Sequence, residues 1–333
     1  MKQYRVIILL FLGILGCTKE LNVDFGEPSK KLVLYPILTN NKDIIIKMSG
    51  PAGILSTNFP VLNNATVIIT DNGVPVDTVK IDLKGKGNSK IIPIPDHEYG
   101  FKATATGYPE AICAAQLPKP VETLSIVDTA HFSFYNMNYI RVRLRIKDDP
   151  NTINYYKVTI YRKKFVTTHI YRGIYPNIIS YDTTYISIWK PRLLANNPVI
   201  DFFYNGVGSF LLARNEINFG DGSHFTFELG SETYFDGIEY YFPDDLFNGK
   251  EMILDLIVEE TNISSFPEKY MIELSSMSED YYRGFKSYAR YGTKEQADLP
   301  VVEEVSIYSA VNGGYGFPIA YSSVIDSSYW MQQ

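Results

Sequence analysis

Alternation between apolar and polar residues recurs along most of this chain, and this is the pattern of a β-strand with one buried face. Residues 139–147 (YIRVRLRIK) show it most clearly, because aliphatic residues alternate there with basic ones. Residues 97–105 (HEYGFKATA) alternate in the same way, with tyrosine, phenylalanine and alanine on one face. An α-helix, which repeats every 3.6 residues, would not separate two such sets. The pattern therefore predicts an all-β fold for most of the chain.

One hairpin is marked within residues 64–80 (NATVIITDNGVPVDTVK). Asn72-Gly73 lies between two β-rich arms, and Asn-Gly is the pair preferred where a two-residue hairpin needs positive φ. Pro75 follows soon after and has no amide proton to donate to a neighbouring strand. We therefore expect a hairpin here whose second strand lies at a sheet edge or contains a bulge.

Two segments depart from simple alternation. Residues 252–258 (MILDLIV) are apolar at nearly every position, which predicts a central strand covered on both faces. Residues 276–292 repeat aromatic side chains at helical spacing; their first four residues fit a capping box, and Gly292 fits a C-terminal stop. This predicts one amphipathic helix near residues 278–291, with its aromatic stripe packed on a sheet.

Pro118 and Pro120 interrupt the succession of strands, because neither can donate a backbone hydrogen bond. A chain of 333 residues is also long for a single hydrophobic core. We therefore place a domain boundary between residues 118 and 119. Residues 30–118 are expected to form an Ig-like antiparallel β-sandwich, and residues 119–333 a larger β-rich domain that contains the helix.

The beginning of the chain has the pattern of an export signal. Lys2 and Arg5 precede an apolar run over residues 6–15. A helix that spans a bilayer needs about 20 apolar residues, so this run is too short to be a membrane span. We expect residues 1–16 to be a signal peptide that is removed.

The end of that signal points to lipidation. Residues 14–17 (ILGC) resemble a bacterial lipobox, in which the cysteine thiol is acylated before cleavage. Two or more acyl chains, such as palmitate, anchor a protein stably to a membrane. Cys17 is therefore the expected lipidation site, and residues 17–29 are a polar tether between the lipid and the folded body.

Composition supports the all-β prediction and limits the partners. The chain has 26 tyrosines and 19 phenylalanines, and aromatic residues favour strands. The formal net charge is −6; without Lys2 and Arg5, 29 basic residues face 37 acidic ones, a net charge of −8. This acidity argues against a nucleic-acid partner. Cys113 would have no disulfide partner once Cys17 is acylated, and its apolar neighbours predict a small core residue.

No local motif for catalysis or cofactor binding occurs. The four histidines lack metal-ligand spacing, and nucleophile-elbow, phosphate-loop and dinucleotide-binding motifs are missing. We therefore expect no enzyme activity, no cofactor and no metal. A glycan hydrolase needs only two carboxylates, however, and no spacing reveals them. The acidic turns at residues 244–248 and at Asp221 are interpreted as solvated turns rather than calcium sites.

A run of basic residues is the strongest local charge feature of this acidic chain. We call it the basic stripe; it consists of Arg141, Arg143, Arg145 and Lys147. It either contacts an anionic partner, such as lipid headgroups or lipopolysaccharide, or forms a solvated strand face balanced by carboxylates on neighbouring strands. The second interpretation is favoured, because opposite charges commonly pair across strands.

Aromatic residues gather in one later segment: Tyr171, Tyr175, Tyr181, Tyr185 and Trp189. They either form a surface on which sugars stack, or fill cores and cross-strand pairs. Tyrosines in strands more often do the second.

Several phrases in a fixed order resemble a family of Bacteroidetes lipoproteins named for a domain of unknown function, DUF4249. The phrases are residues 17–20, 31–37, 63–67, 71–73, 99–109, 154–156, 244–249, 276–286 and 312–316. The resemblance implies an envelope lipoprotein associated with TonB-dependent outer-membrane receptors. It carries over no catalytic residue, and Cys17 alone transfers as a functional position.

The expected function is a non-enzymatic accessory role in nutrient uptake. The chain would be lipid-anchored to the outer membrane, on its periplasmic or its cell-surface face. There it would bind a TonB-dependent receptor and a glycan or other nutrient. Two other functions stay open: a structural or assembly factor of the outer membrane, and a glycan hydrolase without recognisable motifs.

Overall fold

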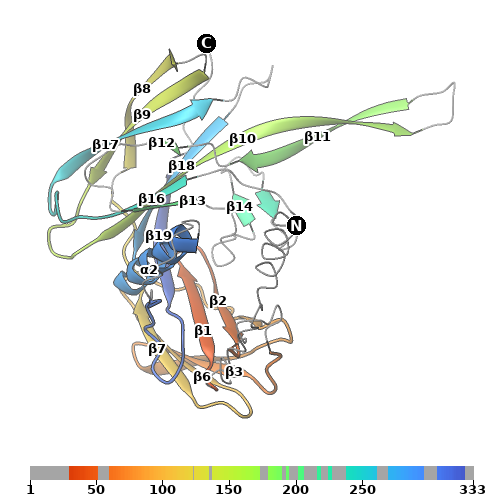
Figure 1. Cartoon of the computed structure of the whole chain (residues 1–333), viewed down its shortest axis with the longest axis vertical. Coiled ribbons are helices and arrows are strands. Elements are labelled where there is room, and N and C mark those ends of the chain that lie inside the picture. Colours follow the sequence, from red (N-terminus) through yellow and green to blue (C-terminus); the bar gives the residue numbers. More distant parts are fainter. Residues whose placement is uncertain are drawn as a thin grey trace, which may run out of the picture.

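The fold is that of a computed structural model of the chain (Figure 1). It describes residues 30–51, 60–122, 124–134, 137–172, 179–189, 193–194, 202–205, 216–218, 224–226, 238–260, 269–295 and 306–326. Within these ranges the chain is mostly β-strand, with one α-helix, α2 (Glu279–Glu295). The predicted all-β fold with a minor helical part is confirmed.

The described strands form one large sheet and three smaller ones. The large sheet has nine strands. Eight of them are neighbours in the order β13 (Phe202–Asn205), β16 (Ile238–Pro243), β10 (Tyr155–Arg172), β18 (Lys269–Met277), β19 (Ile319–Asp326), β1 (Val33–Thr39), β2 (Lys42–Ser49), β5 (Lys86–Asn88). The ninth strand, β11 (Ile179–Trp189), pairs with β10. The smaller sheets are β4 (Val74–Lys80), β3 (Thr66–Asp71), β6 (Glu98–Thr104), β7 (Ala111–Gln116); then β12 (Leu193–Leu194), β17 (Glu251–Glu260), β9 (Met137–Lys147), β8 (Leu124–Phe134); and the pair β14 (Glu216–Asn218), β15 (His224–Thr226).

One end of the large sheet packs against the sheet of β4, β3, β6 and β7 to form the N-terminal β-sandwich. Burial alternates along β1 and β6, as the two-residue period of a strand requires. In β6, Tyr99, Phe101 and Ala103 are buried in the core, and the residues between them are not. The alternation predicted for residues 97–105 is therefore confirmed.

The Asn72-Gly73 hairpin is confirmed. β3 and β4 pair up to Asp71 opposite Val74, and φ is 49° at Asn72 and 81° at Gly73. Positive φ at both positions is what a two-residue hairpin of this kind needs. β4 is an edge strand, and the register shifts where Pro75 enters the pairing. Pro75 thus lies where a missing amide proton is tolerated.

The other end of the large sheet packs against the sheet of β12, β17, β9 and β8. Their shared core contains fully buried aliphatic residues from three strands: Val142 and Leu144 of β9, Leu254 and Leu256 of β17, and Val158 of β10. The chain therefore folds into two β-sandwiches with separate cores, both built on the large sheet.

β17 is a central strand of its sheet, but it is covered on one face only. Leu254, Leu256 and Val258 are buried, whereas Ile253 on the opposite face is 39% exposed. The prediction that residues 252–258 are covered on both faces is wrong. Aliphatic residues favour the strand conformation even on a face that stays partly open to solvent.

α2 lies on the face of the large sheet opposite to the second core (Figure 1). Tyr281 and Phe285 pack with Tyr241 of β16, and the ring centroids of Tyr241 and Phe285 are 5.0 Å apart. Phe317 lies in the same cluster and is 1% exposed. The prediction that the aromatic stripe of the helix packs on a sheet is confirmed.

Both ends of α2 differ from the prediction. Ser278 is the N-cap, because its Oγ accepts a hydrogen bond from the Tyr281 backbone N at 3.3 Å. The capping box expected at residues 276–279 is wrong, since Ser276 belongs to β18. Gly292 lies inside the helix rather than at its end. A glycine in a helix costs about 1 kcal/mol relative to alanine, which is too little to end it.

The large sheet runs across the predicted domain boundary. Leu117 belongs to the first core and Val121 to the second, so the cores divide near residues 118 and 119. β19, however, pairs in parallel with β1, and Ala320 of β19 belongs to the first core. The N-terminal sandwich is therefore not purely antiparallel, because a strand from the end of the chain completes it. The boundary itself stays a prediction.

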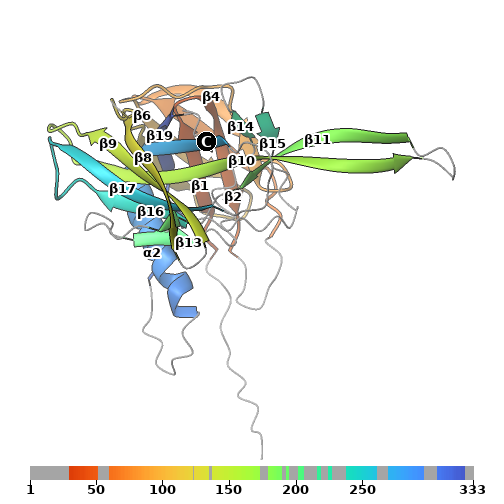
Figure 2. The same ribbon diagram turned by 90° about the horizontal axis from the view of Figure 1, so that it is seen from above.

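β10 and β11 continue into a two-stranded ribbon that extends far from the rest of the fold (Figures 1 and 2). β10 pairs with β18 as far as Lys163. From Lys164 opposite Ser187 to Arg172 opposite Ile179, it pairs with β11 alone. In this part, which we call the β10–β11 ribbon, no other described strand pairs with either outer edge.

Candidate functional site

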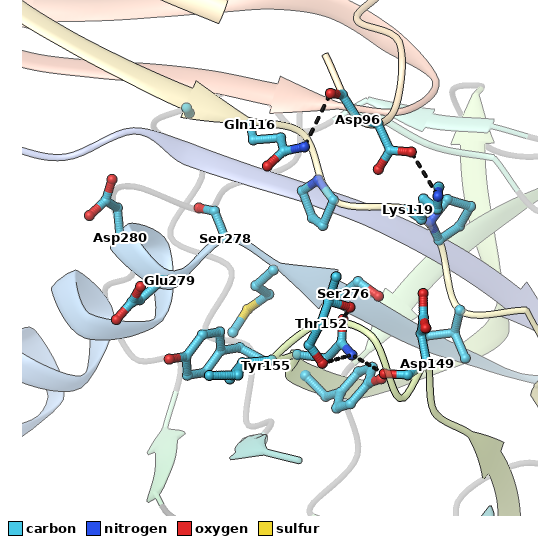
Figure 3. A pocket seen from close by; sticks show the side chains of 18 of the residues that line it. Asp96, Gln116, Lys119, Asp149, Thr152, Tyr155, Ser276, Ser278, Glu279 and Asp280 are labelled. Carbon is cyan, nitrogen blue, oxygen red and sulfur yellow. Dashed lines mark hydrogen bonds and ion pairs between the residues drawn. The ribbon is translucent and has the colours of Figure 1, made fainter. Parts of the chain in front are cut away.

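A cleft of about 520 Å³ lies where the two sandwiches and the helix meet (Figure 3). It is lined by the end of β7, by residues 118–122 that follow it, by residues of the loop 149–154 before β10, by the end of β18 and by the first turn of α2. Clefts of this volume are typical of ligand sites. Its position is fixed by the large sheet, which carries β10, β18 and β1.

Aromatic and small side chains line the part of the cleft next to the large sheet. Tyr155 packs against Tyr282, with ring centroids 4.6 Å apart and the rings tilted by 31°. Tyr156 donates a hydrogen bond to the buried Asp148; burial and then this hydrogen bond raise the pKa of Tyr156. Ser276 is 4% exposed, and its hydroxyl makes no hydrogen bond with any residue that the structure describes.

The rim of the cleft is acidic. The charged residues that line it are Asp96, Glu98, Glu122, Asp149, Glu279, Asp280, Lys119 and Lys147. Lys119 Nζ lies 2.8 Å from Asp96 Oδ2, and this hydrogen bond raises the pKa of Lys119. Lys147 Nζ lies 3.7 Å from Glu122 Oε2. Six carboxylates against two amines leave the cleft with an excess of negative charge.

The first turn of α2 holds two of these carboxylates. Glu279 Oε1 lies 2.6 Å from Arg283 Nη2, one helical turn later. Asp280 accepts a hydrogen bond from the Tyr308 hydroxyl. Burial and then this hydrogen bond raise the pKa of Tyr308 to about 12. Acidic side chains at this end of a helix are also favoured by the helix dipole.

The basic stripe lies on β9, and carboxylates of β17 pair with two of its members. Arg141 donates from Nε to Asp255 Oδ1 at 2.8 Å. This hydrogen bond lowers the pKa of the Asp255 carboxyl. Arg145 Nε lies 2.9 Å from Glu251 Oε1. All four side chains are partly exposed, so each pair stabilises the sheet only modestly.

Arg143 differs, because its Nε is buried and has no hydrogen-bond partner among the described residues. Arg143 lies opposite Asp128 of β8 and Asp255 of β17 in the strand register. Lys147 approaches Glu122 and is the one member of the stripe that lines the cleft. Cross-strand carboxylates therefore accompany the stripe, as the structural interpretation expects. Contact with an anionic partner stays a prediction.

Cys113 is confirmed as a core residue. It is 5% exposed, and burial raises the pKa of its thiol to about 12. The turn at residues 244–248 is exposed at Asp245 and Asn248, as predicted for a solvated turn, but Asp244 is only 1% exposed. Its carboxylate accepts a hydrogen bond from the Asn154 backbone N at 2.7 Å, and burial raises its pKa. Asp244 thus ties this turn to the loop beside the cleft.

Several predicted positions lie outside the part of the chain that the structure describes. They are residues 1–29, which include Cys17, together with Asp221, Tyr175 and the side chains of Tyr171, Tyr181, Tyr185 and Trp189. Among the described residues, no group of three or more histidine, cysteine, aspartate or glutamate side chains is placed to hold a metal ion. In the same ranges, no helix has the length and apolar character needed to cross a bilayer.

The structure brings together a buried polar row that sequence reasoning missed. Glu273 of β18 is fully buried and accepts hydrogen bonds from the hydroxyls of Tyr161 and Ser323. Beside it, Lys157 Nζ lies 3.9 Å from Glu239 Oε1. These residues occupy the polar positions of strands in which polar and apolar residues alternate, and such positions predict a solvent-exposed face.

The cleft could not be predicted from the sequence, because its walls come from segments that are far apart in the chain. Of these segments, only the prolines after β7 are conspicuous in the sequence.

Comparison with known proteins confirms the family that the sequence resembles. No curated protein matches the chain significantly. A solved structure of a Corynebacterium diphtheriae protein described as membrane anchored is 12% identical, with a TM-score of 0.21, and the match covers 76% of this chain and 55% of that one. A structure of manganese lipoxygenase of Gaeumannomyces graminis with part of zonadhesin of Komagataella pastoris is 8% identical, with a TM-score of 0.19, over 75% and 89% of the two chains. Both scores are too low to indicate a shared fold. The model of a domain of unknown function, DUF4249, matches residues 18–325, and the chain belongs to that family.

Proposed function

We propose that this chain is a lipid-anchored protein of the outer membrane that helps a TonB-dependent receptor to capture a nutrient, without an enzymatic reaction of its own. The observation that carries the proposal is the β10–β11 ribbon, which reaches away from both sandwiches (Figure 2). The ribbon can therefore reach a partner protein in the same membrane and bind it. The cleft is the place proposed for the nutrient.

The ribbon suits a protein partner because of its backbone. Between Lys164 and Arg172, β10 pairs with β11 and with no other described strand, so the N–H and C=O groups on the outer edge of each strand are not used in any described sheet. Such edges are templates for an additional strand, and main-chain hydrogen bonds then supply affinity. A receptor strand or loop that pairs with the ribbon would cover them.

The lipid explains why a weak contact suffices. Each buried methylene of an acyl chain contributes about 0.8 kcal/mol, so two or more chains at Cys17 hold the protein at the membrane. A partner in the same membrane then meets it at a high effective concentration. The polar tether over residues 17–29 supplies the reach.

Co-purification tests this function. The tagged full chain is expressed in its own cells, membranes are dissolved in mild detergent, and the captured proteins are identified by mass spectrometry. In a matched variant, Asn-Gly replaces residues 165–186 and joins the register partners Lys164 and Ser187 by a two-residue turn. We expect the wild type to capture a TonB-dependent receptor and the short-ribbon variant to lose it, while the variant keeps a cooperative unfolding transition at the wild-type denaturant midpoint.

Glu98→Gln in the cleft is the control that keeps the ribbon, and it should capture as much receptor as the wild type. Absence of a receptor from the wild-type sample would contradict the proposal. Capture of assembly machinery or of other lipoproteins would favour a structural or assembly function instead. Turnover of a polysaccharide by the purified chain would favour a hydrolase.

A further inference from the structure

β7 has a free backbone edge that lines the cleft. On one side β7 pairs with β6 along its whole length. On the other side Ile112 exchanges two backbone hydrogen bonds with Asn312, at 2.9 and 2.7 Å. Alternate residues of a strand present their N–H and C=O groups to the same edge, so those of Ala114 and Gln116 face the same way as those of Ile112. Within the described chain no strand pairs with them there, and both residues line the cleft.

This edge can accept a short additional strand. The two hydrogen bonds between Ile112 and Asn312 show that a backbone fits against β7 at its first half. Beyond that bridge, Ala114 and Gln116 offer the same groups to a backbone that enters the cleft. Strand addition of this kind takes its affinity from main-chain hydrogen bonds and its specificity from the side chains of the incoming segment.

Ser276 faces the same cleft from β18 and provides a separate indication of a ligand. Its side chain is nearly buried, at 4% exposure, yet its hydroxyl has no hydrogen-bond partner among the described residues. Its oxygen is not one of the fully enclosed side-chain atoms that lack a partner, so the hydroxyl stays open to the cleft. A hydroxyl both donates and accepts, so it can bind either backbone group of an incoming peptide.

The charges of the rim select the side chains of that peptide. Glu98 makes no ion pair with any described residue. Asp149 accepts a hydrogen bond from the Asn151 backbone N at 3.0 Å, which lowers the pKa of Asp149 and keeps it ionised near neutral pH. Together with the other carboxylates, these two favour basic side chains and repel acidic ones.

We infer that the cleft binds an extended peptide segment rich in lysine or arginine, which adds as a strand to the free edge of β7 and sets its basic side chains against the acidic rim. Ile153, which is 68% exposed and lines the cleft, offers apolar surface for the aliphatic stems of those side chains. The inference rests on the proposed capture of a ligand and gives that ligand a chemical class.

Titration of the purified full chain in detergent tests the inference. The probe is an acetylated hexapeptide of alternating lysine and valine, and binding is measured by isothermal titration calorimetry at low and at high ionic strength. The comparison ligands are its glutamate-valine counterpart, spermidine, and the lysine-valine peptide N-methylated at alternate amides. N-methylation removes the strand hydrogen bonds and leaves the charges unchanged.

Two double variants change the charge by the same amount. Glu98→Gln with Asp149→Asn neutralises two carboxylates of the rim, and Asp43→Asn with Asp128→Asn neutralises two carboxylates that do not line the cleft. We expect the lysine-valine peptide to bind the wild type and the distant variant equally, and the rim variant about tenfold more weakly. High salt should weaken binding, because the rim is exposed.

The inference is overturned if the N-methylated peptide or spermidine binds as tightly as the lysine-valine peptide, because the site would then recognise charge alone. Equal binding of the glutamate-valine peptide, or an unchanged affinity of the rim variant, overturns it as well. No receptor is present in the titration, so these results are independent of the co-purification that tests the proposed function.

Discussion

The face of the large sheet opposite to the second core is unusually polar for a buried surface. Glu273 is fully buried, and Thr159 of β10 lies directly opposite it in the register. The carboxylate of Glu273 is surrounded by hydroxyl donors, which stabilise its charge. The hydroxyl of Thr159 has no hydrogen-bond partner among the residues that the structure describes, although the residue is fully buried. An unpaired buried hydroxyl costs about 1–3 kcal/mol.

Thr159→Val should therefore raise the free energy of unfolding, by about 1 kcal/mol, because it removes the unpaired hydroxyl and keeps the shape of the side chain. Urea unfolding followed by circular dichroism measures the change. Thr78→Val, at an exposed position of β4, is the matched control and should change the free energy of unfolding by less than about 0.5 kcal/mol. A loss of stability in Thr159→Val would mean that the hydroxyl is satisfied after all.

Cys113 should be unreactive in the folded protein. Its thiol ordinarily ionises near 9.0, and burial raises the pKa to about 12, so the nucleophilic thiolate is scarce at neutral pH. Because the unfolded thiol loses its proton first, the stability due to Cys113 is present below about pH 9 and is lost as the pH rises toward 12. A thiol reagent at pH 8 should label a chain starting at residue 18 in denaturant and not in buffer. Rapid labelling in buffer would contradict this prediction.

Residues 312–316, which we call the glycine strap, tie the end of the chain to the N-terminal sandwich. Tyr315 exchanges backbone hydrogen bonds with Leu32 and Leu34, each at 2.8 Å. The strap comes so close that a Cβ on Gly316 would lie 2.3 Å from the Leu34 carbonyl oxygen. Gly316 also has a φ of 107°, which L residues rarely adopt. Glycine is required here by both the close approach and the backbone conformation.

Gly316→Ala should lower the free energy of unfolding by more than about 3 kcal/mol, since it adds a steric clash to the conformational strain. Gly107→Ala is the matched control, because Gly107 has a φ of 84° but open space around its Cβ position. It should cost only about 1–2 kcal/mol. Chemical denaturation measures both values. Equal losses in the two variants would show that the strap does not press against Leu34.

Elements that depend on neighbouring residues could be predicted from the sequence. The Asn72-Gly73 hairpin and α2 follow from turn chemistry and from a 3.6-residue period, both of which are local. The N-terminal end of α2 was predicted less accurately. Serine is a good N-cap at either 276 or 278, and Ser278 takes this position because β18 continues to Met277. Polar positions such as Lys157 predict an exposed face, and only the three-dimensional packing shows that they are covered.

The two sandwiches share one continuous sheet and are not two domains joined only by a linker. β1 and β19 are far apart in the chain but pair in the middle of the large sheet, and residues of both lie in the first core. Parallel pairing between distant segments leaves no local trace in a sequence, so the prolines at 118 and 120 marked a division of cores and not a division of sheets. The cleft beside this junction is equally beyond sequence reasoning.

A fragment of residues 18–118 should therefore fail to fold alone. It lacks β19 and the glycine strap, so one edge of β1 would lose its hydrogen bonds and Val311 and Ala320 would be missing from the core. The amide region of its proton–nitrogen NMR spectrum should show poor dispersion, whereas the chain from residue 18 to the end should be well dispersed. A well-dispersed spectrum of the fragment would mean that the N-terminal sandwich is an independent domain.

Membrane attachment through Cys17 is the claim on which the proposed function rests, and the mass of the N-terminal peptide of the protein recovered from membranes tests it most directly. We predict a peptide that begins at Cys17 and carries a diacylglycerol thioether and a fatty acyl amide, with Cys17→Ser released from the membrane fraction or left unprocessed. An unmodified Cys17, or a peptide that still contains residues 1–16, would contradict the account.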